Sequence, residues 1–341
     1  MPWYERENVM PKKNLILFTQ GGAGDVLAHT PMFRGFRKKY PDDQIIVIST
    51  YKTLLEGNPN IDVLLSGDEL EDFHEKYIHN QDVRFFKKHF VYDGFLDVEG
   101  RDSKTLPEFI CKMYSAPYDE GKLDYFTTPY ERKASKTFLE QYEKPVILLH
   151  IMGSIPSEGG GFNKNHKHKD LNPAIVAPLV KKFSDKFTFI QIGLEGEPLV
   201  EGAIDGLGIK FREAVALVQD CFSFIFIESI YMHCSNALGK TGVVVFQNTD
   251  PEFVGYDSNY NVHWSGGCED WPCNRPIVGL DLMAGYRNPK TRERLLWACP
   301  NQVCAQMPTE DLQKAFEECT SKLGEKTRPP TLTLADARKG R

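Results

Sequence analysis

The segment from Asn14 to Pro41 constrains the fold of this chain more than any other part of the sequence. A short apolar run, Leu15 to Phe18, leads into the turn Gly21-Gly22-Ala23-Gly24, and Asp25 follows. An amphipathic pattern comes next. This order predicts a strand, a glycine-rich turn and a helix. Gly22 and Gly24 are expected to contact a ligand, because glycines let a backbone approach closely and helix starts offer N–H groups to anions.

Asp25 is the first candidate for chemistry. A carboxylate and a bound phosphate repel each other, so an acid at this turn indicates more than phosphate binding. It predicts a general base at the mouth of a ligand cleft. The alternative is a structural role as the N-cap of the helix, which Asp fills well, and the two roles are compatible. Pro31 lies inside the helix pattern and predicts either the end of a helix or a kink.

Apolar and amphipathic segments alternate along the chain, and the pattern restarts near residue 144. Strands are expected at 15–18, 44–49, 63–65, 146–150, 187–192, 222–227 and 243–246, helices at 105–114, 172–183 and 212–218, and a helix-prone connector at 130–143. A further apolar stretch lies at 92–98. The alternation predicts an α/β protein with parallel sheets covered by helices. The restart predicts two Rossmann-like domains, 1–143 and 144–322, facing each other across a ligand cleft.

Composition excludes several classes of protein. The length of 341 residues suggests about two domains. The net charge of -6 argues against a general nucleic-acid binder. No apolar run reaches the length of a membrane span, and the first residues lack an apolar signal core. Eight cysteines in so long a chain do not suggest a secreted disulfide scaffold, so a cytoplasmic location is expected. The charged tail, 323–341, is expected to be disordered or loosely packed.

A second group of candidates follows the first strand of the second half. Gly153 and Ser154 could place an N–H group and a hydroxyl on a phosphate, and Lys164, Lys167 and Lys169 add positive charge. A Gly- and Lys-rich run is also typical of a solvated loop. The position at a strand end favours ligand binding but does not choose among the lysines.

Two further strand ends carry polar residues. Glu197 follows the strand at 187–192 and could bind ribose hydroxyls, although an ordinary exposed loop acid fits the pattern too. Glu228 ends the strand at 222–227, and Ser229 is expected to cap the next helix. His233 is one turn further on, beside any diphosphate bound at that helix start. A histidine in a helix is otherwise a core residue.

The cysteines include two close pairs. Cys268 and Cys273 enclose four residues, as do Cys299 and Cys304. Paired thiolates at short spacing suit a tetrahedral site for zinc or iron. Two disulfides are one alternative, which a cytoplasmic location disfavours. Four unrelated buried thiols are another.

The order of these motifs resembles that of glycosyltransferase family 9, the bacterial heptosyltransferases. The likeness runs from about Asn14 to Lys322. It rests on GAGDVLAHTPMFRGFRKKYP, LLEGNPNIDVLL, HIMGSIPS followed by KDLN, GLEGE, IESIYMH, VVVFQNTDPEFVGY and CAQMPTEDLQKAFEE. Glu228 stands where the family has Asp, and Ile230 where it has Gly. The four paired cysteines resemble those of autotransporter heptosyltransferases, which hold iron.

The resemblance implies a GT-B fold and inverting transfer of a sugar, a heptose first, from a nucleoside-diphosphate donor such as ADP-heptose. It implies Asp25 as the base, Glu197 on the ribose, and Lys169, Ser229 and His233 at the diphosphate. Gly153, Ser154, Glu228 and Thr249 would complete the donor site. No cofactor is implied for catalysis, and iron or zinc would be structural. The acceptor would be a glycan, as in lipopolysaccharide biosynthesis, or a protein. The sequence leaves a homo-oligomer open.

Two other functions stay open from the sequence. A sugar-nucleotide 2-epimerase shares the two-domain architecture and would convert its substrate with no acceptor present. A non-catalytic protein would bind a nucleotide sugar without turnover, with Asp25 only a helix cap.

Overall fold

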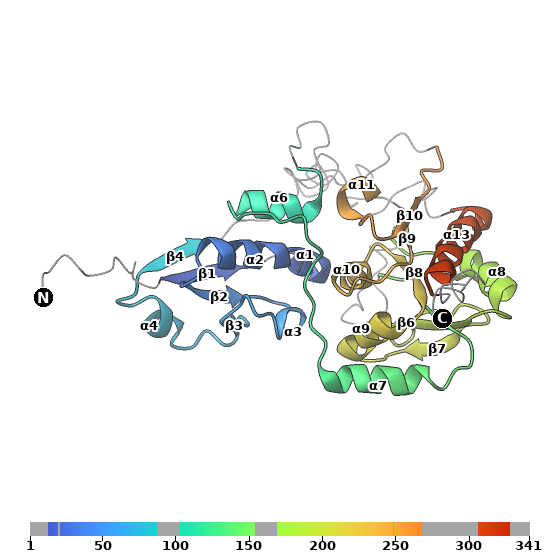
Figure 1. Cartoon of the computed structure of the whole chain (residues 1–341), viewed down its shortest axis with the longest axis horizontal. Helices are drawn as coiled ribbons and strands as arrows, with labels where there is room; N and C mark the ends of the chain where they lie inside the picture. The colour runs from blue at the N-terminus through green and yellow to red at the C-terminus, as the bar shows by residue number, and fades with distance from the viewer. Residues whose placement is uncertain are drawn as a thin grey trace, which may run out of the picture.

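Two parallel sheets form the frame of the molecule (Figure 1). The computed structural model describes residues 13–19, 21–86, 103–153, 169–247, 249–267 and 306–327. The first sheet has the order β3-β2-β1-β4 and contains β1 (Asn14–Phe18), β2 (Gln44–Ile48), β3 (Val63–Leu65) and β4 (Val83–Phe86). The second has the order β10-β9-β8-β5-β6-β7 and contains β5 (Val146–His150), β6 (Thr188–Gly193), β7 (Ile204–Leu207), β8 (Ser223–Ile227), β9 (Val243–Phe246) and β10 (Tyr260–His263).

The predicted α/β architecture of two parallel units is confirmed, since every described strand pair is parallel. The helices are α1 (Ala23–Ala28), α2 (Thr30–Lys39), α3 (Lys52–Leu55), α4 (Phe73–Tyr77), α6 (Leu106–Met113), α7 (Pro129–Leu139), α8 (Pro173–Phe183), α9 (Phe211–Asp220), α10 (Ile230–Ala237), α11 (Pro251–Val254) and α13 (Thr309–Thr327). The strands expected in the described residues are all present. The expected apolar stretch at 92–98 lies outside the described residues.

The inner strands of both sheets are buried on both faces, which is why they read as continuous hydrophobic runs. In β1, Leu15 and Leu17 join the core formed with α1, α2 and α6, while Ile16 packs toward α4. In β8, Phe224 and Phe226 belong to the core beneath α9 and α10, and the alternate residues face α8 and α13.

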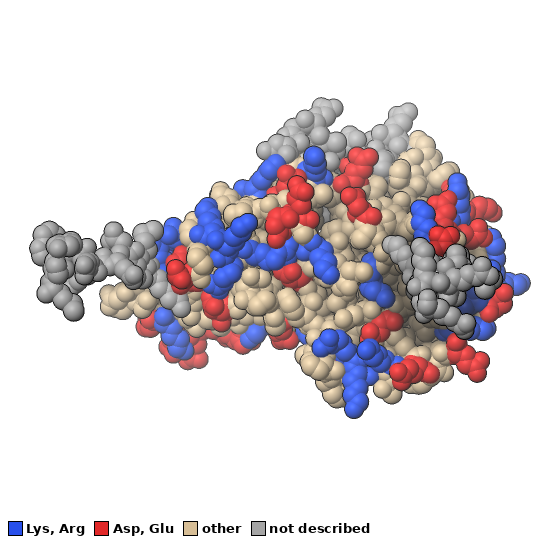
Figure 2. Space-filling model, in the orientation of Figure 1, with Lys and Arg blue, Asp and Glu red and all other residues tan. Residues whose placement is uncertain are grey.

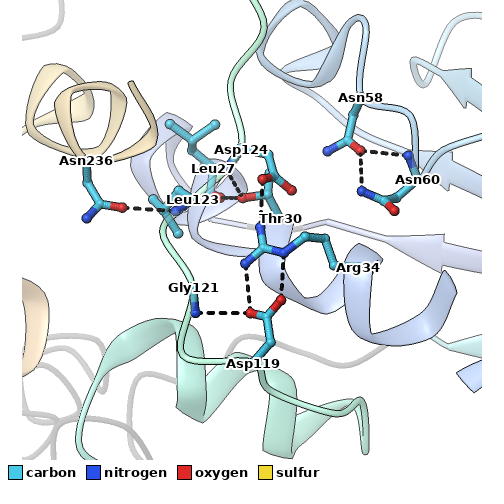
Figure 3. Close-up of polar contacts among 10 residues, drawn as sticks. All are labelled: Leu27, Thr30, Arg34, Asn58, Asn60, Asp119, Gly121, Leu123, Asp124 and Asn236. Atoms are coloured by element: carbon cyan, nitrogen blue, oxygen red, sulfur yellow. Dashed lines mark hydrogen bonds and ion pairs between the residues drawn. The ribbon is translucent and has the colours of Figure 1, made fainter. Parts of the chain in front are cut away.

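A break at His29 divides the predicted first helix into α1 and α2. Pro31 has no N–H to donate to the carbonyl of Leu27, so a continuous helix would lose that bond. The hydroxyl of Thr30 donates to the Leu27 carbonyl instead, at 2.8 Å (Figure 3). The side-chain bond thus satisfies the Leu27 carbonyl, and α1, which carries Asp25, contacts α10 of the second half.

An extended segment, residues 115–128, links the two halves (Figures 1 and 3). The N–H of Asp124 donates to Thr30 of α2 at 2.9 Å, and the N–H of Leu123 donates to the side chain of Asn236 in α10, also at 2.9 Å. Arg34 holds the same segment through a bidentate pair with Asp119. The segment is therefore hydrogen-bonded to a helix of each half.

Arg212, near the start of α9, makes a second connection. Its guanidinium pairs with Glu131 of α7 at 2.6 Å and donates to the carbonyls of Thr53 and Phe126. It also lies over the ring of Tyr125, 5.4 Å from the ring centroid. One side chain of the second half thus contacts α3, α7 and the linking segment.

The expectation for the end of the chain was partly wrong. α13 continues through Gly324 to Thr327 and packs on α8, so the helix extends into the region expected to be loose. Residues 328–341 lie outside the described part. Among the described residues, no helix has both the length and the apolar character that a bilayer crossing requires. On the face shown in Figure 2, basic and acidic side chains are intermixed.

Candidate active site

The two halves of the molecule meet where α1 packs against α10, at the carboxyl ends of the parallel strands (Figure 1). Gly24 of α1 touches His233 of α10 so closely that a Cβ on Gly24 would lie 2.6 Å from the ring atom Cδ2. The two halves of the molecule therefore meet, at the carboxyl edges of their sheets, through a glycine of α1 and an imidazole of α10. In parallel α/β proteins this edge is where ligands bind.

Asp25 is the third residue of α1, and Gly22 is the N-cap. The alternative role of Asp25 as the N-cap is wrong in position, because Gly22 is the N-cap. Its Oδ2 accepts a hydrogen bond from the N–H of Gly22 at 2.7 Å, which is the return half of a capping box. An acid in the first helical turn also interacts favourably with the helix dipole. The carboxylate is thus held at the turn, next to the contact with α10.

Lys169, Glu228 and Thr249 come together from three different loops. The ammonium of Lys169 lies 2.7 Å from Oε2 of Glu228, and the Thr249 hydroxyl donates to the same oxygen at 2.9 Å. One carboxylate oxygen of Glu228 therefore accepts from both groups. Its negative charge holds Lys169 at the ends of β8 and β9.

Gly153 lies beside this group. Its N–H donates to Oδ1 of Asp170 at 2.8 Å, and the side chain of Gln247 donates to the Asp170 carbonyl at 2.8 Å. These bonds join the ends of β5 and β9 to the residue after Lys169. Of the predicted Gly-Ser turn, the backbone of Gly153 is therefore held by a hydrogen bond to Asp170.

Ser229 stands at the N-cap of α10 as predicted, but its hydroxyl does not cap the helix. It contacts Nδ1 of His150 at 3.1 Å instead. His150 is buried at the end of β5, its ring 4.6 Å from that of Tyr231, and burial lowers its pKa to about 3. The expected side-chain cap was wrong because a buried histidine competes for the hydroxyl.

Glu197 is buried, with 5% of its surface exposed, in the loop after β6. Oε2 has no hydrogen-bond partner among the described residues. Burial raises the pKa of this carboxyl to about 7. A buried acceptor without a partner carries a desolvation cost that a ligand hydroxyl would relieve. The reading of Glu197 as an ordinary exposed acid is therefore wrong, and the ribose role stays a prediction.

His233 is buried as well, and its Nδ1 lies 2.6 Å from the hydroxyl of Tyr256. Burial lowers its pKa to about 4, so the ring is neutral near pH 7. It contributes to the site as a polar neutral group rather than as a cation.

Several predicted residues lie outside the described part of the chain. These are Ser154, Lys164, Lys167 and the four paired cysteines, Cys268, Cys273, Cys299 and Cys304. Within the described ranges, no cluster of His, Cys, Asp or Glu has the form of a metal site. The zinc or iron site stays a prediction.

Sequence reasoning missed His150, Asp170 and Tyr256. His150 ends a predicted strand, and Asp170 follows Lys169. Both positions could have indicated a place in the site. Tyr256 gave none, because its contact with His233 joins residues 23 positions apart through the tertiary fold.

Comparison with solved structures decides the fold. A glycosyltransferase of family 9 from Veillonella parvula matches with a TM-score of 0.62 and 15% identity, over 91% of this chain and 97% of that one. This chain has the fold of the family 9 glycosyltransferases. Escherichia coli ADP-heptose lipopolysaccharide heptosyltransferase II matches with a TM-score of 0.53 and 15% identity, over 80% of this chain and 99% of that one. A third match is TibC of enterotoxigenic E. coli, an iron-containing dodecameric heptosyltransferase. Its complex with ADP-D-β-D-heptose matches with a TM-score of 0.61 and 13% identity, over 92% of this chain and 77% of that one.

The GT-B fold predicted from the order of the motifs is thereby confirmed. No protein-family model and no curated protein sequence matches the chain. At 13–15% identity, likeness of structure extends to the fold and leaves the chemistry to be argued from the site.

Proposed function

We propose that this chain is an inverting glycosyltransferase that moves a sugar, a heptose in the first instance, from a nucleoside-diphosphate donor to a hydroxyl of a glycan or protein. The observation that carries the proposal is the contact of α1 with α10. It supports the proposal because α1, whose third residue is Asp25, packs against α10, which carries His233 and follows Glu228 and Ser229. Transfer between two substrates requires a base for the acceptor hydroxyl on one side of the sugar. It also requires groups on the other side that bind the leaving diphosphate.

In the proposed reaction Asp25 takes the proton of the acceptor hydroxyl, and the oxygen attacks the anomeric carbon from the face opposite the diphosphate. The bond from that carbon to the diphosphate oxygen breaks, and the nucleoside diphosphate leaves. Lys169 and the N-terminal turn of α10 would stabilise the new charge, and Glu197 would bind the ribose. Fixed N–H groups and a lysine can do this work without a metal ion, so we propose no catalytic cofactor.

The donor and assembly are proposed from the neighbours. ADP-heptose is the first donor to test, because TibC was solved with ADP-D-β-D-heptose and a second neighbour is an ADP-heptose heptosyltransferase. The dodecameric state of TibC supports a homo-oligomer here. A cytoplasmic location is proposed, where nucleotide sugars and reduced thiols occur.

Thermal unfolding with ADP-, GDP-, UDP-, CMP- and dTDP-linked ligands tests the donor site. A ligand at 100 times its Kd should add about 2.7 kcal/mol to the free energy of unfolding. Lys169→Ala should weaken binding by about 10- to 100-fold, since a hydrogen bond to a charged group contributes about 1.5–3 kcal/mol. The control is Lys144→Ala, at the opposite end of β5, where the ammonium donates to the Ser184 carbonyl. No response to any nucleotide would contradict the proposal.

A further inference from the structure

Among the described residues the side chain of Tyr256 makes one hydrogen bond, to a residue of the proposed diphosphate site. Its hydroxyl lies 2.6 Å from Nδ1 of His233, and the two rings meet edge to face with centroids 5.6 Å apart. Tyr256 follows α11, and the side chain of Asn261 donates to its carbonyl at 3.2 Å. The tyrosine is thus attached to β10, while the histidine belongs to α10.

The direction of this hydrogen bond follows from the partners available. Among the described residues the Tyr256 hydroxyl has no other partner, so its proton is directed at Nδ1. Burial raises the pKa of this hydroxyl well above 10, which keeps it a donor. The imidazole of His233 is neutral, as its lowered pKa requires. A neutral ring that accepts at Nδ1 carries its hydrogen on Nε2.

The Nε2 atom faces α1. It has no hydrogen-bond partner among the described residues, and it lies 2.7 Å from the position that a Cβ of Gly24 would occupy. Its N–H therefore lies at the junction of α1 and α10, beside the glycine turn that precedes Asp25. If the ring had the other tautomer, the same edge would present a lone pair, which repels an anionic oxygen.

We propose that Tyr256 is a positioning residue: its hydroxyl holds His233 in the Nε2–H tautomer and so presents a fixed N–H donor to the donor diphosphate. The inference rests on the proposed function for the identity of the ligand. In many functional histidines a carboxylate or a carbonyl bonded to one ring nitrogen determines which nitrogen carries the hydrogen. The proposal gives this role to the Tyr256 hydroxyl.

Nitrogen-15 NMR of the histidine side chains tests the proposal, using Tyr256→Phe, which keeps the ring and removes the hydroxyl. His233→Gln assigns the resonance among the nine histidines. His29 is an internal reference for the opposite tautomer, because its Nδ1 donates to the Asp25 carbonyl at 2.7 Å. Tyr260→Phe is the matched control, since the Tyr260 hydroxyl makes no hydrogen bond among the described residues.

The wild-type protein should show His233 protonated at Nε2, and Tyr256→Phe should give a mixture of tautomers. ADP affinity should fall about two- to tenfold in Tyr256→Phe, as expected for one neutral hydrogen bond, and stay constant in Tyr260→Phe. A wild-type His233 protonated at Nδ1, or a spectrum unchanged by Tyr256→Phe, would overturn the proposal. A wild-type protein with the expected spectrum that binds neither ADP nor any nucleotide sugar would instead overturn the proposed function and the ligand role with it.

Discussion

Replacing Gly24 with alanine tests the contact on which the site is built. Gly24 lies in α1, where alanine is the better helix former by about 1 kcal/mol, so local structure alone favours the change. The new methyl group would lie 2.6 Å from Cδ2 and 2.7 Å from Nε2 of His233. Contacts of that length force a shift, and overpacking of this kind costs about 1–3 kcal/mol. The two effects together predict a net loss of about 0–2 kcal/mol.

A double-mutant cycle with His233→Ala separates these effects. Without the imidazole, Gly24→Ala should be neutral or stabilising by up to about 1 kcal/mol, so a coupling energy of about 1–3 kcal/mol is expected. The assay is urea unfolding of the wild type, both single variants and the double variant. Gly67→Ala is the control, because no atom lies within 4 Å of the added Cβ. Equal effects of Gly24→Ala in the two backgrounds would refute the contact between α1 and α10.

Three other predictions concern the connection of the two halves, a buried acid and the cysteines. Arg212→Met should loosen the two halves and increase the radius of gyration in solution scattering, while the exposed control Arg132→Met should not; an unchanged radius would contradict the account. Glu197 has its pKa raised from 4.5 to about 7, so stability should fall as pH rises between these values, by up to about 1.4 kcal/mol per unit. Glu197→Gln should remove this slope, which unfolding at several pH values would reveal. Elemental analysis of purified protein should find iron or zinc, and four free thiols without metal at Cys268, Cys273, Cys299 and Cys304 would refute the metal site.

The sequence was sufficient to predict the inner strands of the two sheets because those strands are buried on both faces. The run at 15–18 is apolar throughout, and a glycine turn follows it. Parallel strands bring their carboxyl ends to one edge, so the polar residues after them were expected together. Lys169, Glu228 and Thr249 do lie together. β4, β7 and β10 were missed because each is a four-residue strand at the edge of its sheet with little fully buried surface.

Side-chain direction was harder to predict than position. Ser229 is at the start of its helix, yet its hydroxyl turns to His150, which comes from another strand. Asp25 is in the first turn of its helix, but which residue caps that helix depends on the backbone of Gly22. The pair of Tyr256 with His233 depends on where the segment between α11 and β10 lies against α10. Each case involves a partner that a local pattern does not contain.

The most direct test of the central claim is the release of nucleoside diphosphate from ADP-heptose, measured with and without acceptor, for the wild type and Asp25→Asn. Truncated lipopolysaccharide and unmodified protein serve as acceptors, and Asp185→Asn, at an exposed site, is the control. The account predicts acceptor-dependent release that Asp25→Asn reduces by about 10²–10⁴-fold, with ADP binding nearly unchanged. Full activity in Asp25→Asn would contradict the assignment of the base. Conversion of the nucleotide sugar without acceptor would contradict transfer and point to an isomerase, and binding without any turnover would leave a nucleotide-sugar-binding protein.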